Sequence, residues 1–284
     1  MNALSSTQLE AFFTVAQTKS FTKAAERLHI TQSALSQRIL NLEETLETTL
    51  FIRDRAGLQL TEVAQKLVRY CQAKNDLESD FLSSVKAAEQ ISGLVRIGGF
   101  SSVMRSVIIP ALAPLFREHP GLQLQVVTKE MSELLSVLKT GEVDFIVTSQ
   151  KHERDEFESV LLGHEQNVLV EAKDHKGTEI YLDHDSSDDM TLAYLRKAGI
   201  KTTQIRRRYL DDVYGLIDGV KCGLGKAVLP RHLIAREKDL RILHPKIFLQ
   251  TEVHLAHFKQ PYYSSLHRQV VMNLVERSQA LREK

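Results

Sequence analysis

The chain has 284 residues, of which 43% are hydrophobic and 26% charged, and its formal net charge is +1. This composition is typical of a folded protein with two domains and excludes a largely disordered chain. No apolar run is long enough to span a membrane, and the first ten residues do not resemble a secretory signal. Cys71 and Cys222 form no motif with other cysteines or histidines, so we expect a cytoplasmic protein with no disulfide, metal site or cofactor.

Residues 1–61 are predicted to form three helices followed by a small wing. Apolar side chains recur at helical spacing in residues 6–18, Thr22 is placed to cap a second helix, and Thr31 is placed to cap a third. The third helix has a narrow apolar stripe that begins at Leu35. This pattern indicates two short helices joined by a tight turn, which is the arrangement of a helix-turn-helix.

The exposed side of the third predicted helix begins with uncharged polar groups that can both donate and accept hydrogen bonds. Such groups can read base edges in the major groove of DNA. Residues 1–61 contain six basic and six acidic residues, so bulk charge does not explain DNA binding. On periodicity alone, a small helical bundle without DNA contact remains the alternative. The polar residues are Gln32, Ser33, Ser36 and Gln37.

A longer motif decides between these alternatives. Residues 20–43 read SFTxAAxxLxITQSALSQRIxxLE, and Leu50-Phe51-x-Arg53 and Leu60-Thr61 follow. This run resembles the N-terminal signature of LysR-type transcriptional regulators over about residues 6–67. One departure is visible after Leu-Thr-Glu, where the family usually has a small residue and then glycine. This sequence has Val63 and Ala64 instead, which a helix start tolerates.

The resemblance implies a winged helix-turn-helix DNA-binding domain and assigns roles to its residues. Thr22 would contact a phosphate at the start of its helix, and Arg53 would contact the backbone or the minor groove from the wing. For Arg38 an ion pair with another helix remains an alternative to DNA contact. The implied recognition surface consists of Thr31, Gln32, Ser33, Ser36, Gln37 and Arg38.

Residues 62–91 are predicted to form a linker helix. Alternating steps of four and three residues place apolar side chains at most positions of one stripe, as in a coiled-coil seam. In the LysR family this helix pairs two subunits, so we expect a homodimer or a homotetramer. Packing of the stripe against its own chain is the alternative. The seam positions are Val63, Leu67, Tyr70, Lys74, Leu77, Phe81, Ser84 and Ala88.

Residues 92–284 are predicted to form an α/β effector-binding domain. Strands and helices alternate from Leu94 to Thr148, which favours a parallel sheet, and the pattern then repeats more loosely. Segments 109–112 and 223–230 resemble the LysR effector domain, which implies two hinged subdomains of the periplasmic-binding-protein type with a cleft between them. The expected subdomains are 92–162 with 259–284, and 163–258.

Ligands of α/β sheets bind beyond the carboxyl ends of the strands, and this rule selects the candidate effector residues. Ser101 and Ser102 also begin a helix, which suits an anion such as a carboxylate, although helix capping explains them as well. An acidic cluster from Asp183 to Asp189 favours a basic ligand such as a diamino acid, or forms a solvated loop. The candidates are Ser101, Ser102, Thr128, Thr148, Ser149 and Asp183.

We therefore predict a sequence-specific transcription regulator of the LysR type and not an enzyme. It would bind an interrupted palindrome in double-stranded DNA as a dimer or tetramer and respond to an amino acid or organic acid in the C-terminal cleft. RNA polymerase is a further candidate partner, and no membrane contact is expected. The sequence lacks a phosphate-binding loop, a dinucleotide fingerprint and a nucleophile elbow. The alternative function is a small-molecule-binding protein of the periplasmic type.

Overall fold

The computed structural model describes residues 4–54, 57–85, 91–152, 154–174, 179–235 and 237–281. The chain divides into two compact units, and each is described by itself. The first comprises Met1–Phe100, Ala113–Ser159 and Leu255–Asn273, and the second comprises Ser101–Leu112, Val160–His254 and Leu274–Lys284. Within the described ranges, no helix is long and apolar enough to cross a membrane.

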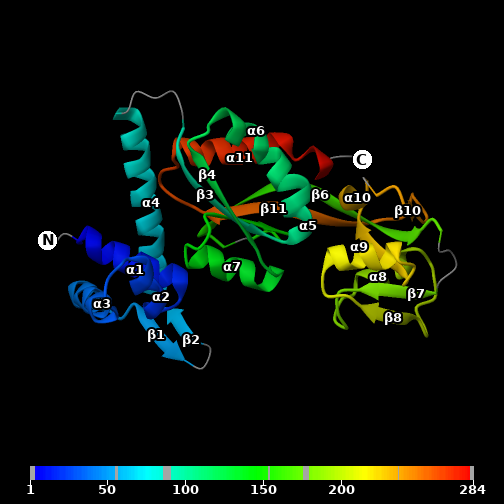
Figure 1. Ribbon diagram of the computed structural model, residues 1–284, viewed down its shortest axis with the longest axis horizontal. Coiled ribbons are helices and arrows are strands. Elements are labelled where there is room, and N and C mark those ends of the chain that lie inside the picture. Colours follow the sequence, from blue (N-terminus) through cyan, green and yellow to red (C-terminus); the bar gives the residue numbers. More distant parts are fainter. Residues whose placement is uncertain are drawn as a thin grey trace. The chain divides into compact units, whose positions relative to one another are not determined.

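The first unit begins with three helices and a hairpin that share one core (Figure 1). Phe12, Leu35, Leu42 and Leu50 are fully buried there, and the Phe12 and Phe51 rings lie 5.5 Å apart. The hairpin strands are antiparallel, with Phe51 opposite Leu60. The predicted winged helix-turn-helix is thereby confirmed. Its elements are α1 (Ser6–Thr18), α2 (Phe21–Arg27), α3 (Gln32–Leu46), β1 (Phe51–Asp54) and β2 (Gly57–Leu60).

Helix α4 (Glu62–Val85) follows the hairpin and has two different sides. On one side, Ala64, Val68 and Cys71 join the core of the three helices. Leu67, from the predicted seam, also packs into this core and is 8% exposed. Other seam residues lie on the surface. Val63 is 41% exposed, Tyr70 49% and Leu77 50%. Ala88 lies outside the described residues.

The remainder of the first unit is built on strands in the order β4-β3-β5-β11. Strand β3 is parallel to both β4 and β5, as the alternating pattern predicts, with Gly99 opposite Thr128 and Val147. Strands β6 and β11 each run from one unit into the other. The bounds are β3 (Gly93–Gly99), β4 (Leu122–Thr128), β5 (Phe145–Thr148), β11 (Leu249–Phe258), α6 (Ile109–Glu118), α7 (Met131–Lys139) and α11 (Ser265–Arg277).

The second unit has strands in the order β6-β9-β7-β8, with β10 paired to β6. Strand β7 is parallel to β8 and β9, whereas β9 and β10 are antiparallel to β6. Its elements are β6 (Phe157–Ala172), β7 (Ile180–Asp183), β8 (Arg206–Tyr209), β9 (Lys226–Pro230), β10 (Leu240–Ile242), α5 (Ser101–Val103), η1 (Met104–Ile108), α8 (Met190–Lys197), α9 (Val213–Lys221), α10 (Arg231–Ile234) and η2 (Gln279–Leu281).

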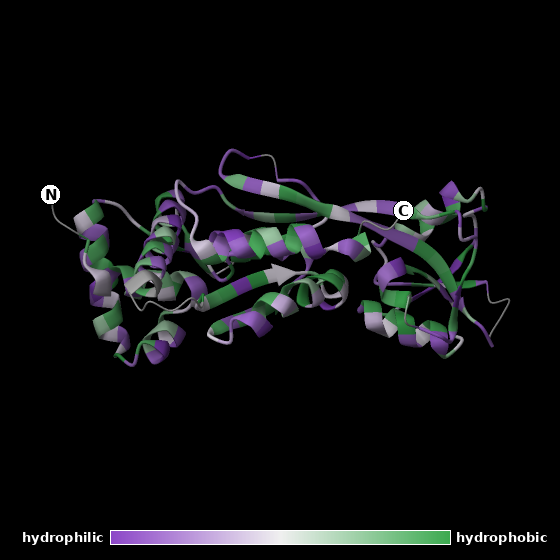
Figure 2. Ribbon diagram, turned by 90° about the horizontal axis from the view of Figure 1, so that it is seen from above, coloured by the Kyte–Doolittle hydropathy of each residue, from purple (hydrophilic) through white to green (hydrophobic). Residues whose placement is uncertain are grey.

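The predicted helix 101–118 is not a uniform α-helix. Its first turn α5 leads into the π-helical turn η1, and the amide of Ile109 donates to the carbonyl of Met104, five residues earlier. Pro114 lies inside α6. Hydrophobic and hydrophilic residues share most helices, as expected where one side of a helix faces a core (Figure 2).

In the first unit, the Asp76 side chain of α4 lies near an ion pair of the sheet. Arg96 and Asp144 form a bidentate ion pair, with Nη2–Oδ1 at 2.8 Å and Nε–Oδ2 at 3.0 Å. Burial raises the pKa of the Asp76 carboxyl to about 7; Asp144 and Asp80 add to the rise, and Arg96 opposes it. The Oε1 atom of Gln72, also on α4, is buried without a hydrogen-bond partner among the described residues. When Asp76 is ionised, its carboxylate and the Oε1 atom of Gln72 are therefore both acceptors that need hydrogen-bond donors.

We predict that Asp76 makes stability fall as pH rises. The folded-state pKa of about 7 lies above the ordinary value of 3.8, so the folded chain holds a proton that the unfolded chain has lost. The free energy of unfolding should decline between about pH 4 and pH 7. Asp76→Asn should remove this slope and raise stability near pH 8 by on the order of 1 kcal/mol. Thermal unfolding across this range measures the effect.

The control is Asp80→Asn on the same helix. Asp80 accepts hydrogen bonds from the Tyr262 hydroxyl at 2.6 Å and the Ser265 amide at 3.1 Å. Its loss should lower stability because these two donors lose a charged acceptor, and it should leave most of the Asp76 slope in place because burial is the main cause of the Asp76 shift. An Asp76→Asn profile parallel to that of the wild type would contradict the assignment.

Candidate DNA-binding surface and effector residues

Side-chain caps define the starts of α2 and α3. The Ser20 hydroxyl accepts a hydrogen bond from the amide of Lys23 at 3.3 Å, and the Thr31 hydroxyl accepts one from the amide of Ala34 at 3.2 Å. The predicted cap at Thr31 is confirmed, whereas the predicted cap at Thr22 is wrong. Ser20 is extended (φ −153°) and satisfies the free amide, so α2 begins two residues before the predicted start.

Thr22 lies instead in the first turn of α2, where it is exposed. Its hydroxyl donates to Oε1 of Gln32 at 3.5 Å. The residue assigned to a phosphate contact therefore lies beside the start of α3, which carries the residues assigned to the bases. A phosphate contact at Thr22 would thus fix the position of α3 relative to the duplex.

The polar side of α3 faces away from the core, as predicted. Leu35 and Ile39 are buried, whereas the side chains assigned to base contact are exposed. Arg38 is half-buried and forms no ion pair with any described residue, so the alternative role considered for it lacks a partner. Gln37 donates from Nε2 to Asn41 Oδ1 at 2.7 Å, which orients its amide along the helix. The exposed residues are Thr31, Gln32, Ser33, Ser36 and Gln37.

A groove of about 530 Å³ lies between α3 and the wing. Its walls include Ser33, Ser36 and Gln37 from the helix and Arg53 from β1. The Arg53 guanidinium carbon lies 5.9 Å from the centroid of the Phe21 ring. This contact holds an exposed cation at the edge of the groove, where a phosphate or a minor-groove edge could reach it.

Glu43 positions the wing, a role that the sequence pattern did not indicate. Its Oε1 accepts hydrogen bonds from the amide of Leu50 at 2.6 Å and from that of Phe51 at 3.4 Å. The carboxylate of the recognition helix therefore fixes the first strand of the wing. The signal in the sequence was an acidic residue in the last turn of a helix, shortly before the first strand of the wing.

Three candidate effector residues lie in the first unit. Thr128 ends β4 and is exposed, whereas Thr148 ends β5 and is 4% exposed. Ser149 follows and is half-buried. Because β4 and β5 flank β3 in parallel, all three residues lie at the same edge of this sheet, as the strand-end rule predicts.

Ser101 and Ser102 belong to the second unit. They form the short helix α5, which has only three residues. Ser102 is 6% exposed, and its carbonyl accepts a hydrogen bond from the Ser106 hydroxyl at 2.6 Å. The carbonyl of Ser101 lies 3.5 Å from the Tyr214 hydroxyl, which donates to it. Anion binding at these two serines stays a prediction.

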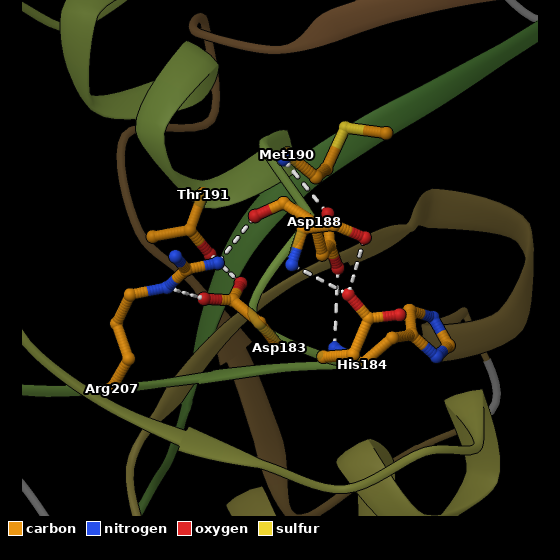
Figure 3. A network of polar contacts seen from close by, with 8 residues as sticks. Asp183, His184, Asp188, Met190, Thr191 and Arg207 are labelled. Atoms are coloured by element: carbon orange, nitrogen blue, oxygen red, sulfur yellow. Dashed lines mark hydrogen bonds and ion pairs between the residues drawn. The ribbon is translucent and has the colours of Figure 1, made fainter.

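Asp183 is 2% exposed and lies within an ion-pair network (Figure 3). Its Oδ2 pairs with Nε of Arg207, and its Oδ1 accepts a hydrogen bond from the Thr191 hydroxyl. Arg207 also donates to the carbonyl of Asp188. Both carboxylate oxygens are thus engaged within the chain. Asp183 as an effector ligand stays a prediction, and its contacts give it a structural role.

Two further carboxylates of the acidic cluster, those of Asp185 and Asp188, are also engaged. Asp188 accepts hydrogen bonds from the amides of His184 at 3.2 Å and Met190 at 2.9 Å. Asp185 accepts bonds from the amide and hydroxyl of Ser187, and these bonds lower its pKa. These carboxylates shape the turn before α8. Among the described residues, no group of three or more metal-binding side chains is positioned to hold an ion.

Family models match both parts of the chain. Residues 6–65 match the bacterial regulatory helix-turn-helix protein of the lysR family, and residues 88–279 match the LysR substrate binding domain. The chain belongs to the LysR family. This result confirms the resemblance and agrees with the expectation of a regulator rather than an enzyme.

Several relatives and solved structures are similar to the chain. The transcriptional regulator HdfR of Yersinia enterocolitica is 31% identical over 157 residues, which is 55% of this chain and 53% of HdfR. The chain thus spans about half the length of this relative. YofA of Bacillus subtilis is 26% identical over 81% of this chain and 83% of its own.

Two solved structures share the fold. ArgP of Mycobacterium tuberculosis has a TM-score of 0.77 at 21% identity and covers 98% of this chain and 99% of its own. LysG of Corynebacterium glutamicum, with bound effector Arg, has a TM-score of 0.71 at 18% identity and covers 96% of this chain and 97% of its own.

We predict that the exposed side chains of α3 carry sequence preference and that Arg53 carries affinity. Ser33→Ala with Gln37→Ala should reduce discrimination between the preferred site and variants of it by about 1–3 kcal/mol. Arg53→Gln should weaken binding to all sequences and reduce the salt slope by about 1. Fluorescence anisotropy with labelled duplexes at several salt concentrations measures both effects.

Gln125→Ala is the matched control, because Gln125 is exposed on β4 away from α3. It should bind like the wild type. An unchanged sequence preference in the double variant would show that the recognition surface is wrongly assigned.

Proposed function

We propose that the chain is a DNA-binding transcription regulator that reads an interrupted palindrome as a dimer or tetramer. The observation that carries this proposal is the polar side of α3, which is exposed beside the Arg53 wing in a domain of the LysR family. A protein that binds chromosomal DNA would act in the cytoplasm. RNA polymerase is a further proposed partner.

The exposed side of α4 supports pairing of two copies. Val63, Tyr70 and Leu77 follow each other at seven-residue spacing, so they lie along one stripe of the helix. Each is at least 41% exposed. A second α4 would bury this stripe, and two paired linker helices would hold two recognition helices for a two-fold site.

A small-molecule effector is the proposed regulator. The match to a LysR substrate binding domain supports it, as does the edge of the first unit where Thr128, Thr148 and Ser149 lie together. The bound Arg in LysG makes an amino acid a proposed class of effector. Because the Asp183 carboxylate is paired with Arg207, we do not assign it the basic end of such a ligand.

Selection of duplexes from a random library by the full chain tests the DNA proposal. We expect enriched sites to contain two inverted half-sites, since a two-fold dimer presents two recognition helices about one helical turn or a multiple apart. Enrichment of no sequence would overturn the proposal. Enrichment of single half-sites would overturn its dimeric part.

We predict that Leu77→Asp weakens self-association. A carboxylate on the exposed stripe would lose its hydration when two helices pair, so dissociation should shift to a protein concentration at least about tenfold higher. Asn75→Asp is the control, because it adds the same charge to an exposed position off the stripe. Sedimentation equilibrium measures both variants. An unchanged dimer in Leu77→Asp would place the interface elsewhere.

A further inference from the structure

The second unit contains a pocket whose lining includes none of the candidate effector residues, although the hydroxyls of Ser106 and Tyr214 in its wall donate to the carbonyls of Ser102 and Ser101. It lies beside η1 and α10 and has a volume of about 390 Å³. Arg105 and Arg231 line it, together with Tyr214, Pro110 and Leu233. This volume falls in the range of sites that hold small organic molecules.

The charges of the lining side chains favour an anion. Neither Arg105 nor Arg231 forms an ion pair with a described residue. Among the lining residues that the structure describes, Glu237 is the only acid, and it is paired with Lys221. The described lining therefore has two guanidinium groups available to a ligand and offers no free carboxylate to a cation.

Arg231 has a buried donor without a partner. Its Nη2 donates to the carbonyl of Pro245 at 3.2 Å, but its Nε has no hydrogen-bond partner among the described residues. A buried N–H without an acceptor is unfavourable, so the Arg231 guanidinium has hydrogen-bonding capacity that the described residues do not use. Arg105 stacks on Tyr214, with its guanidinium carbon 3.7 Å from the ring centroid, so its plane is held in place.

A buried chain of polar groups forms one wall of the pocket. Nδ1 of His232 lies 2.7 Å from the Ser106 hydroxyl, and Nε2 lies 2.7 Å from Oε1 of Glu165. The side chains of His232 and Glu165 are only 4% and 9% exposed. Ser106 and Arg105 both lie on the π-helical turn η1, and such turns occur frequently at functional sites.

The chain Ser106–His232–Glu165 has the residue types of a hydrolytic triad but not its geometry. In the triad the serine bonds Nε2 of the histidine and the acid bonds Nδ1, whereas here these contacts are exchanged. The Ser106 hydroxyl also has the carbonyl of Ser102 within 2.6 Å as an acceptor. These contacts fix the wall of a binding pocket and do not activate a nucleophile.

We propose that this pocket binds a small organic carboxylate. The carboxylate would accept hydrogen bonds from the guanidinium groups of Arg105 and Arg231, and the carbon skeleton would pack on the apolar walls at Pro110 and Leu233. This site is independent of the effector assignment at Thr148 and Ser149, so either can fail without the other.

Titration calorimetry of the full chain with phenylacetate tests the proposal. We expect binding that weakens at least about tenfold in Arg105→Gln and in Arg231→Gln, because each loses a charge-assisted hydrogen bond. Arg196→Gln is the matched control, since Arg196 is exposed on α8 away from the pocket. Phenylacetamide and phenethylamine, which share the ring but lack the carboxylate, should bind at least about tenfold more weakly than phenylacetate.

Three results would overturn the proposal. They are the absence of phenylacetate binding, binding that both arginine variants leave unchanged, and tighter binding of inorganic phosphate than of phenylacetate. Thermal unfolding of each variant checks that it is folded. Arg105→Lys keeps the charge but not the planar fork, so it should bind with intermediate affinity and serves as the second variant at this position.

Discussion

Helix α4 packs into the DNA-binding core on one side and leaves an apolar stripe exposed on another, and the N-terminal half of the chain depends on this constraint. Ala64, Val68 and Cys71 complete the core of the DNA-binding domain, so the first turns of the helix cannot move away without opening that core. Tyr70 and Leu77 point elsewhere and stay exposed. A helix that is bound on one side to its own domain and on the other to a second copy would transmit the dimer arrangement directly to the recognition helix.

The DNA-binding domain achieves its proposed function without a basic excess. The cap at Ser20 sets the start of α2, the cap at Thr31 sets the start of α3, and Glu43 in the last turn of α3 fixes the wing. Each side chain accepts a hydrogen bond from a backbone amide that would otherwise lack an acceptor. Specificity then depends on the placement of a few exposed groups relative to the grooves, since placement rather than total charge distinguishes one sequence from another.

Periodic patterns in the sequence predicted the helices, the strands and their buried sides, because these features depend on contacts between residues that are close in the sequence. The stripe that begins at Leu35 gave the buried side of α3, and alternating elements gave the parallel order of β3, β4 and β5. The pairing of Asp183 with Arg207 was not predictable, because it depends on the register of β7 against β8. In the wall of the pocket beside η1 and α10, Ser106 contacts His232, which lies 126 residues later in the sequence. No spacing pattern in the sequence reveals such a contact.

A set of contacts within the first unit joins α1 to the segment that leads into β5, and it begins at Gly141. Its carbonyl accepts a hydrogen bond from Gln17 of α1 at 2.9 Å. Its φ of +70° favours glycine, and a Cβ there would lie 2.7 Å from a ring carbon of Phe13, so α1 can approach only a glycine this closely. The chain continues from this point into β5, which ends at Thr148. A ligand at that end would influence α1 only to the extent that it binds one arrangement of these contacts more tightly than another.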